Sequence, residues 1–257
     1  MYKSKFAVVT GGAGGIGQCV AETFLREGAD VAVIDIDKTA GENFQKNFPN
    51  AQFFHGDVGD KSALENFVKM LERPVDFLIN NACIGRKGIL SGCSWDDFEY
   101  VQRVGVTAPY YLTSLLLNGN LLSSGASIVN IASTRAFQSQ PDTESYSSAK
   151  GGIVALTHAM AVSLAGRARV NSISPGWIDV SQYHNNSKPS QHSSQDKIQH
   201  PSKRVGKPED IADMVLYLCS DKAHFITGEN ITIDGGMSKQ MIYHGDYGWK
   251  LEDETGF

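Results

Sequence analysis

Short runs of β-branched and aromatic residues recur along the chain, each separated from the next by a stretch with helical character. This alternation predicts a parallel sheet, because consecutive parallel strands need a crossover such as a helix. We therefore expect an α/β, doubly wound, Rossmann-type fold in three layers, with helices on both faces of the sheet. A chain of 257 residues fits a single domain, residues 1–257. The expected strands are Ala7–Thr10, Val31–Asp35, Gln52–His55, Phe77–Asn80, Ser127–Ile131, Val170–Ile173 and Ile231–Asp234.

A glycine-rich turn, Thr10 to Gly17, follows the first expected strand and opens the first expected helix, which should end near Arg26. In this context, glycines let the backbone approach a pyrophosphate that the helix N-terminus then binds. The turn therefore indicates a dinucleotide cofactor, and the candidate contacts with it are Gly11, Gly15, Ile16 and Gly17. The alternative is a tightly packed turn that binds nothing.

Asp35 ends the second expected strand, about 20 residues past the glycines. A carboxylate there can accept hydrogen bonds from the adenosine ribose hydroxyls and repel a 2′-phosphate. The turn holds no Arg or Lys, and none directly follows Asp35. The pattern favours NAD over NADP, and the alternative is a solvated Asp at a strand end.

Tyr146 and Lys150 stand four residues apart in a helical stretch, so both project from one face. A neighbouring ammonium favours the phenolate, which would let Tyr146 exchange a proton near neutral pH. Such pairs also occur by chance on solvated helices, so the pair alone does not establish a site.

Several motifs occur together and in order. They are the glycine turn of residues 10–17, Asn80 to Ala82, Ser133, and Tyr146 with Lys150; Asp57-Val58, Asn171, Pro175-Gly176, Thr227-Gly228 and Asp234 to Gly236 accompany them. Through these motifs, the chain resembles the classical short-chain dehydrogenases/reductases from about Phe6 to Met237.

The resemblance implies a role for each matched residue. Ser133 would hydrogen-bond the substrate oxygen, Tyr146 would exchange its proton, and Lys150 would hold the nicotinamide ribose while supporting the phenolate. The cofactor would supply or accept a hydride. The resemblance also implies contacts of the cofactor with Asp57 and Val58 at the adenine, with Asn80, Ala82, Pro175 and Gly176 along its path, and with the Ile178 backbone at the carboxamide.

The chain departs from the family pattern at Gly105, where the family usually carries a fourth catalytic residue, Asn. Pro109 lies four residues later and cannot donate to the Gly105 carbonyl, so we expect a kink in the helix that Ser94 and Asp97 begin. The freed carbonyl could hold a water near the Lys150 ammonium. Lesser departures are Cys83 and Val180, where the family usually has Gly and often Thr.

The overall composition narrows the choice of partners. The formal net charge is −5 with scattered Lys and Arg, so we expect no nucleic-acid or membrane partner. The chain has no apolar run long enough for a membrane helix, and strand-like sequence starts almost at once, which predicts a cytoplasmic protein without a signal peptide. The four cysteines lack paired metal-ligand spacing, so we expect free thiols and no metal site.

Two segments lack regular apolar periodicity. Residues 181–204 are polar and are expected to form a substrate lid or a disordered loop. The C-terminal extension, residues 238–257, carries apolar side chains that would dock on the lid or a neighbouring subunit, or else fray. The resemblance implies a homotetramer or homodimer.

The sequence thus predicts an enzyme that uses NAD(H) to interconvert a secondary alcohol and a ketone, with Tyr146 as general acid/base. The polar lid, with Arg86, Lys87 and Arg135 nearby, slightly favours a polyol, sugar or hydroxy acid. Two alternatives stay open: a catalytically weak NAD(H)-binding or sensor protein, because of Gly105, and a related isomerase or dehydratase that holds NAD tightly.

Overall fold

Strands and helices alternate along the chain in the computed structural model, which describes residues 2–183, 190–243 and 245–246. The strands are β1 (Phe6–Thr10), β2 (Asp30–Asp35), β3 (Gln52–His55), β4 (Val75–Asn80), β5 (Leu122–Ile131), β6 (Ala168–Pro175) and β7 (Asn230–Ile233). The α-helices are α1 (Gly15–Arg26), α2 (Lys38–Asn47), α3 (Lys61–Lys69), α4 (Trp95–Gln102), α5 (Ala108–Asn118), α6 (Glu144–Ser163), α7 (Ser194–Ile198) and α8 (Pro208–Cys219).

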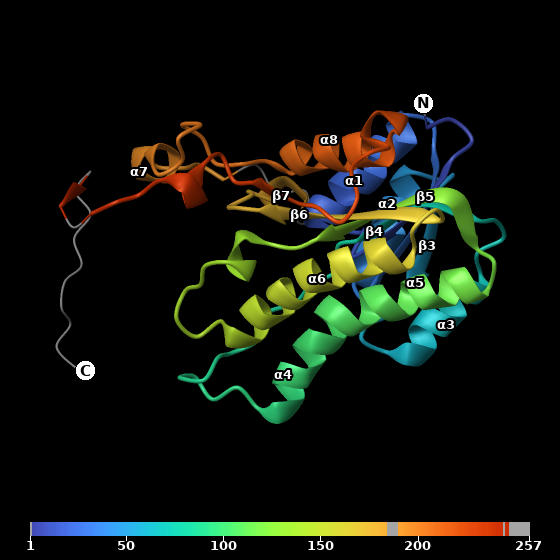
Figure 1. Ribbon diagram of the computed structural model, residues 1–257, viewed down its shortest axis with the longest axis horizontal. Coiled ribbons are helices and arrows are strands. Elements are labelled where there is room, and N and C mark those ends of the chain that lie inside the picture. The colour runs from blue at the N-terminus through green and yellow to red at the C-terminus, as the bar shows by residue number, and fades with distance from the viewer. Residues whose placement is uncertain (1, 184–189, 244, 247–257) are drawn as a thin grey trace.

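The described strands form one parallel sheet in the order β3-β2-β1-β4-β5-β6-β7. The chain winds outward in one direction from β1 to β3, then returns to the centre and winds the other way from β4. Helices cover both faces, with α1 and α8 on one side and α3, α5 and α6 on the other (Figure 1). This arrangement confirms the doubly wound, Rossmann-type fold.

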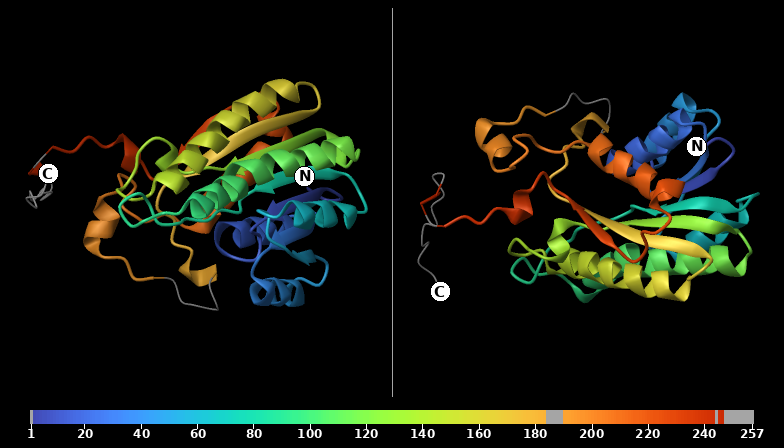
Figure 2. Two further views of the ribbon diagram at one scale, coloured as in Figure 1. Left: turned by 90° about the horizontal axis from the view of Figure 1, so that it is seen from below. Right: turned by 45° about the horizontal axis from the view of Figure 1, so that its top comes forward.

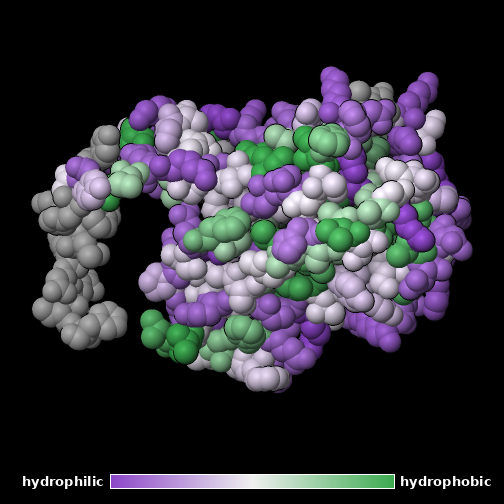
Figure 3. All heavy atoms as spheres, in the orientation of Figure 1, coloured by the Kyte–Doolittle hydropathy of each residue, from purple (hydrophilic) through white to green (hydrophobic). Residues whose placement is uncertain are grey.

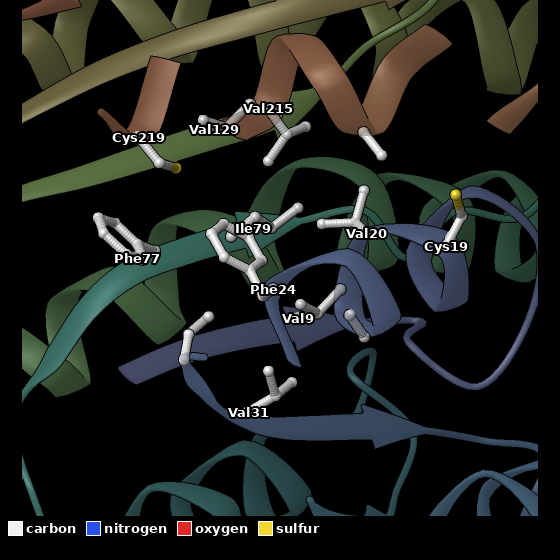
Figure 4. Close-up of a cluster of buried hydrophobic side chains, with 14 of the residues drawn as sticks. Val9, Cys19, Val20, Phe24, Val31, Phe77, Ile79, Val129, Val215 and Cys219 are labelled. Carbon is white, nitrogen blue, oxygen red and sulfur yellow. The ribbon is translucent and has the colours of Figure 1, made fainter. Parts of the chain in front are cut away.

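Two apolar cores, one on each face of the sheet, hold these layers together. In the first, Phe24 of α1 stacks on Phe77 of β4 with ring centroids 5.4 Å apart. Val215 and Cys219 of α8 approach the same cluster (Figure 4). Strand side chains alternate between the faces, so an almost continuously apolar strand such as β1 serves both cores.

The helix after β4 is interrupted in its middle. Ser94 caps α4 by accepting a hydrogen bond from the Asp97 backbone N–H, as predicted. A π-helical turn, η1 (Arg103–Thr107), then separates α4 from α5, with the Ala108 N–H donating to the Arg103 carbonyl. Pro109 directly follows and lacks the N–H that an α-helix needs at that point. The predicted interruption therefore takes the form of a π-helical turn.

The lid expected over residues 181–204 includes short helices: η3 (Ser181–Tyr183) and α7. It lies at the end of the sheet where the strands have their carboxyl termini, together with the loop between β5 and α6 (Figure 2). Residues 184–189 of the lid lie outside the described part. No helix within the described ranges combines the length and apolar character needed to cross a bilayer.

The C-terminal extension leaves the body of the molecule after η5 (Met237–Lys239) (Figures 1 and 2). Met241 and Tyr243 are 74% and 68% exposed. Within the described residues, the extension does not bury these side chains on its own lid. The predicted docking on a neighbouring subunit stays a prediction, and residues 244 and 247–257 lie outside the described part.

Candidate active site

The glycine turn between β1 and α1 is clamped to the end of β4. The Asn81 side-chain amide donates to the carbonyl oxygens of Thr10 and Gly11, each at 3.0 Å. In return, the Thr10 hydroxyl accepts from the backbone N–H groups of Asn81 and Ala82. A Cβ on Gly17 would overlap the Gly11 carbonyl oxygen, so this close packing requires a glycine. The turn thus presents the N-terminus of α1 in a fixed position.

A cavity of about 380 Å³ opens beside this turn. It lies at the carboxyl ends of β1 and β4, where the strand order reverses, the place at which doubly wound folds bind ligands. Val180 reaches over the turn from the segment after β6, 3.6 Å from where a Gly15 Cβ would stand. The predicted cofactor residues in its lining are Gly11, Gly15, Ile16, Asp35, Asp57, Val58 and Ala82.

Two carboxylates give the cavity its polarity. Asp35 accepts hydrogen bonds from the backbone N–H groups of Ala13, at 2.9 Å, and Asp37, at 3.0 Å, which fix it against the glycine turn. No Lys or Arg belongs to the described lining. The lining can therefore accept hydrogen bonds from hydroxyl or amine groups and opposes an extra anion near Asp35.

Asp57, the second carboxylate, is held from two sides. Its Oδ1 accepts from the Gly59 N–H at 2.7 Å, and its Oδ2 accepts from the Tyr100 hydroxyl at 2.8 Å. Burial and the hydrogen bond with Asp57 raise the pKa of Tyr100, so its hydroxyl stays protonated and remains a donor. Tyr100 also lines the cavity.

The candidate catalytic residues come from α6 and the end of β5. Lys150 is buried, 4% exposed, and its Nζ donates to the Ile131 carbonyl at 2.7 Å. The same Nζ lies 5.4 Å from the centroid of the Tyr146 ring, so the helical spacing brings the two side chains together as predicted. Ser133 follows β5 and accepts a hydrogen bond from the Arg135 N–H, which leaves its own proton available to a substrate oxygen.

Three other residues predicted to contact the cofactor do not line this cavity. Asn80 is buried and its amide donates to Asn130 at 2.8 Å; the neighbouring Asn81 lines the cavity instead. Gly176 allows β6 and β7 to approach, since a Cβ there would lie 2.6 Å from the Asp234 Cβ. The residues around Ile178 form a bridge, in which Asp179 donates to the Gly206 carbonyl and Gly206 donates to that of Trp177. The Ile178 N–H and C=O consequently face away from Gly206.

The cavity beside the glycine turn is lined by residues predicted to bind the adenosine part of the cofactor, and the predicted catalytic residues lie elsewhere. Ser133, Tyr146, Lys150, Pro175, Gly176 and Ile178 lie outside the described lining of the glycine-turn cavity. Both groups nevertheless lie at the carboxyl ends of the strands. The arrangement is suited to a long ligand that spans from Asp35 and Asp57 at one end to α6 at the other.

Known proteins resemble the chain over almost its whole length. A family model described as enoyl-(acyl carrier protein) reductase matches residues 11–238. The chain belongs to the classical short-chain dehydrogenase/reductase family. It is therefore an oxidoreductase, and members of this family generally use NAD(P).

Individual members show how close the relation is. An uncharacterized oxidoreductase of Thermotoga maritima is 43% identical, over 95% of this chain and 99% of the relative. An apo SCOR enzyme from Clostridium thermocellum has 47% identity and a TM-score of 0.87, with 98% of this chain and 99% of that chain covered. A glucose/ribitol dehydrogenase of the same family from Brucella melitensis has 30% identity and a TM-score of 0.81, covering 92% and 97%.

Gly105, which the resemblance places at the position of the family's usual Asn, lies in the π-helical turn η1. A Cβ at Gly105 would come within 2.9 Å of the Ala149 Cβ, closer than such atoms normally approach. The glycine therefore lets η1 pack against α6 directly beside Lys150. The predicted water between the Gly105 carbonyl and the Lys150 ammonium stays a prediction.

Sequence reasoning did not identify three contributors to the site: Asn81 as a clamp, the Ile131 carbonyl as the partner of Lys150, and Tyr100 as the partner of Asp57. Asn81 stands within the Asn80–Ala82 motif, which carried a usable signal. A backbone carbonyl leaves no mark in a sequence. Tyr100 is 43 residues from Asp57, and nothing in its local pattern indicates the hydrogen bond.

Proposed function

We propose that the protein transfers a hydride between NAD(H) and a secondary alcohol or ketone, with Tyr146 as general acid/base. The observation that carries this proposal is the placement of the buried Lys150 ammonium against the Tyr146 ring. A positive charge held beside the ring can stabilise the negative charge that develops on the phenol oxygen during proton transfer.

The cavity beside the glycine turn fits the adenosine and pyrophosphate part of a dinucleotide. The glycines let the backbone approach phosphates at the α1 N-terminus, where the helix dipole favours negative charge. Asp35 would accept hydrogen bonds from the ribose hydroxyls, which supports NAD over NADP. When bound, the nicotinamide ring would supply or accept the hydride.

The protein's own residues would handle the proton. In ketone reduction, Ser133 would donate a hydrogen bond to the carbonyl oxygen while Tyr146 gives its phenolic proton to that oxygen. The Lys150 ammonium would stabilise the resulting phenolate and stay fixed through its bond to the Ile131 carbonyl. In alcohol oxidation, the same groups would act in reverse.

For the substrate, we propose a polyol, sugar or hydroxy acid. The support is the polar lid, residues 181–204, and the presence of a glucose/ribitol dehydrogenase among the structural relatives. We further propose that the chain works as one domain in a cytoplasmic homotetramer or homodimer, without nucleic-acid or membrane partners. The mild net charge of −5 argues against nucleic-acid and membrane partners. The exposed side chains of the C-terminal extension are available to pack on a second subunit.

A panel of secondary alcohols, sugars and polyols with NAD⁺ and with NADP⁺ tests the proposal. Formation of reduced nicotinamide is followed by its absorbance. We expect at least one polyhydroxylated substrate to be oxidised, with a higher kcat/KM for NAD⁺ than for NADP⁺. A higher kcat/KM for NADP⁺ would contradict the role given to Asp35.

Gly105 favours a second candidate, a weakly catalytic NAD(H)-binding or sensor protein, because the side chain of the usual Asn is absent. Binding of NADH without turnover of any substrate in the panel would support the sensor. Turnover without added cofactor would instead support an isomerase or dehydratase with tightly held NAD. Stoichiometric consumption of NADH with a ketone would support the dehydrogenase over both.

A further inference from the structure

Tyr100, which lines the cofactor cavity, contacts two segments that are distant from it in the sequence. Its hydroxyl donates to Asp57, in the loop after β3, and its ring packs against Gly59, where a Cβ would lie 2.8 Å from Cε2. The Arg86 guanidinium, from the loop after β4, lies 5.2 Å from the ring centroid. Tyr100 itself comes from α4.

Two arginines fix the Tyr100 ring. Arg86 is held in place by an ion pair of its Nε with Asp97 at 3.2 Å. Arg103 lies 5.7 Å from the same ring centroid. Cations near an aromatic ring are attracted to its face, so both guanidinium groups restrict the motion of the ring and of its hydroxyl.

The tyrosine hydroxyl in turn determines where Asp57 points. With Gly59 N–H on Oδ1 and Tyr100 on Oδ2, the carboxylate plane is set from both sides. Each carboxylate oxygen can accept more than one hydrogen bond, so Asp57 can still receive a donor from the cavity. An ionised carboxylate accepts only, so it recognises an amine and not a carbonyl at that place.

We propose that Tyr100 is a positioning residue for the adenine of the cofactor: it orients the Asp57 carboxylate to accept a hydrogen bond from the exocyclic adenine amine. This inference rests on the proposed use of an adenine dinucleotide and goes beyond it, since it assigns base selectivity to a residue outside the family motifs. Tyr100 acts through Asp57 and takes no part in hydride or proton transfer.

The test compares Tyr100→Phe with wild type by calorimetric titration of AMP, NAD⁺ and nicotinamide mononucleotide. Loss of a hydrogen bond to a charged group should weaken AMP and NAD⁺ binding by about tenfold. Binding of the mononucleotide, which lacks adenine, should not change. The matched control is Tyr111→Phe, which removes a similar bond, Tyr111 hydroxyl to Glu65 at 2.7 Å, away from the cavity. This control should leave AMP binding unchanged.

Nicotinamide hypoxanthine dinucleotide provides the decisive comparison, because it carries a carbonyl in place of the adenine amine. Wild type and Tyr100→Phe should bind it equally. In an Asp57→Asn background, adding Tyr100→Phe should cost no further AMP affinity, because the two residues act as one unit. Thermal unfolding of each variant shows that it is folded.

Different results would overturn the proposed function and the role given to Tyr100. If wild type binds neither AMP nor NAD⁺, the proposed function itself is wrong. If wild type binds NAD⁺ and Tyr100→Phe binds it as tightly, the role of Tyr100 is overturned. An equal loss for the adenine and hypoxanthine dinucleotides would also overturn it, since Tyr100 would then shape the cavity without acting through Asp57.

Discussion

Asp35 places a fixed negative charge at the end of the cavity where an adenosine ribose would bind. Two backbone N–H groups hold its carboxylate, so it cannot easily turn away from an approaching phosphate. The described lining offers no Lys or Arg to compensate for a 2′-phosphate. At the scale of single residues, this carboxylate should decide which nucleotide the enzyme uses.

Replacing Asp35 should therefore relax cofactor choice. In Asp35→Ala, we expect the ratio of kcat/KM for NAD⁺ to that for NADP⁺ to fall by about tenfold or more, because repulsion of the 2′-phosphate is lost. Steady-state kinetics with both cofactors measures the ratio. Asp37→Asn is the control, since it removes a nearby charge but retains an oxygen to cap α2. An unchanged ratio in Asp35→Ala would contradict the account.

Residues that act through local spacing could be predicted, while those that act through tertiary contacts could not. Tyr146 and Lys150 are one helical turn apart, so the sequence alone places them together. Asp35 was identifiable because it ends a strand that a glycine turn precedes. The partners of Lys150 and Asp57 depend on how α6 and α4 pack against distant loops, which no local pattern encodes.

At the scale of elements, the close packing of η1 on α6 explains the glycine at position 105. Adding a methyl group should push the two apart, because Ala149 is a short side chain that cannot turn away. We expect Gly105→Ala to lower the free energy of unfolding by about 1–2 kcal/mol and to lower kcat, since the shift acts beside Lys150. Chemical denaturation and steady-state kinetics measure the two effects.

A control on α6, the helix against which η1 packs, tests this reasoning. At Gly151, the nearest atom to an added Cβ is the Ala136 carbonyl oxygen at 3.9 Å, an ordinary contact. Gly151→Ala should be neutral or stabilising by up to about 1 kcal/mol, because alanine favours helix. Ala149→Gly removes the atom that the new Cβ would meet, but it places a glycine inside α6, which itself costs about 1 kcal/mol. The double variant Gly105→Ala/Ala149→Gly should therefore be no less stable than Ala149→Gly alone, and a further loss of stability in the double variant would show that η1 and α6 do not clash as described.

The base of the lid depends on Asp179. Burial by itself would raise the pKa of Asp179, but hydrogen bonds from Ser181, His192 and Ser190 outweigh it and lower the pKa to about 2. A carboxyl with a depressed pKa stabilises the folded state at pH values above its unfolded pKa of 3.8. That contribution is lost as the pH falls from about 4 to about 2.

Asp179→Asn should therefore be less stable than wild type at pH 7, by about 2 kcal/mol at most. The difference should shrink as the pH is lowered towards 2, because wild-type Asp179 then loses its charge as well. Urea unfolding of both proteins at pH 7 and at pH 3 gives the two differences. A difference that is equal at both pH values would show that the Asp179 charge does not anchor the lid.

Element prediction was weakest where polar residues continue a strand. β5 begins at Leu122, five residues before the apolar run from Ser127, because Ser123, Ser124 and Gly125 extend it where the sheet is exposed. Apolar periodicity detects only the buried part of a strand. The π-helical turn was foreseeable as an irregularity from Pro109, but its form depends on packing against α6.

At the scale of the whole molecule, apolar side chains remain at the surface. Phe225 is 94% exposed and Val162 is 77% exposed. Figure 3 shows apolar residues as separate groups among hydrophilic ones on the face in view. Single apolar side chains are common on protein surfaces, so the exposure of Phe225 and Val162 does not itself indicate an oligomer, and substitution at Phe225 tests whether it lies in a subunit contact.

Phe225→Glu should weaken a contact between subunits, because it would bury a charge. We expect wild type to elute as a dimer or tetramer in size-exclusion chromatography with light scattering, and Phe225→Glu to shift towards a smaller species. Gly151→Ala, within α6, is the control, and its molar mass in solution should equal that of wild type. A wild-type monomer at micromolar concentration would contradict the proposed assembly.

The central claim is that Tyr146 carries the proton while the cofactor binds independently of it. Tyr146→Phe keeps the ring that Lys150 packs against and removes only the hydroxyl. NADH binding and NADH-dependent ketone reduction should be measured on the same preparations of wild type and variant. The account predicts that turnover falls by about 10²–10⁴-fold while the Kd for NADH stays within about twofold. Turnover retained without the hydroxyl would contradict it.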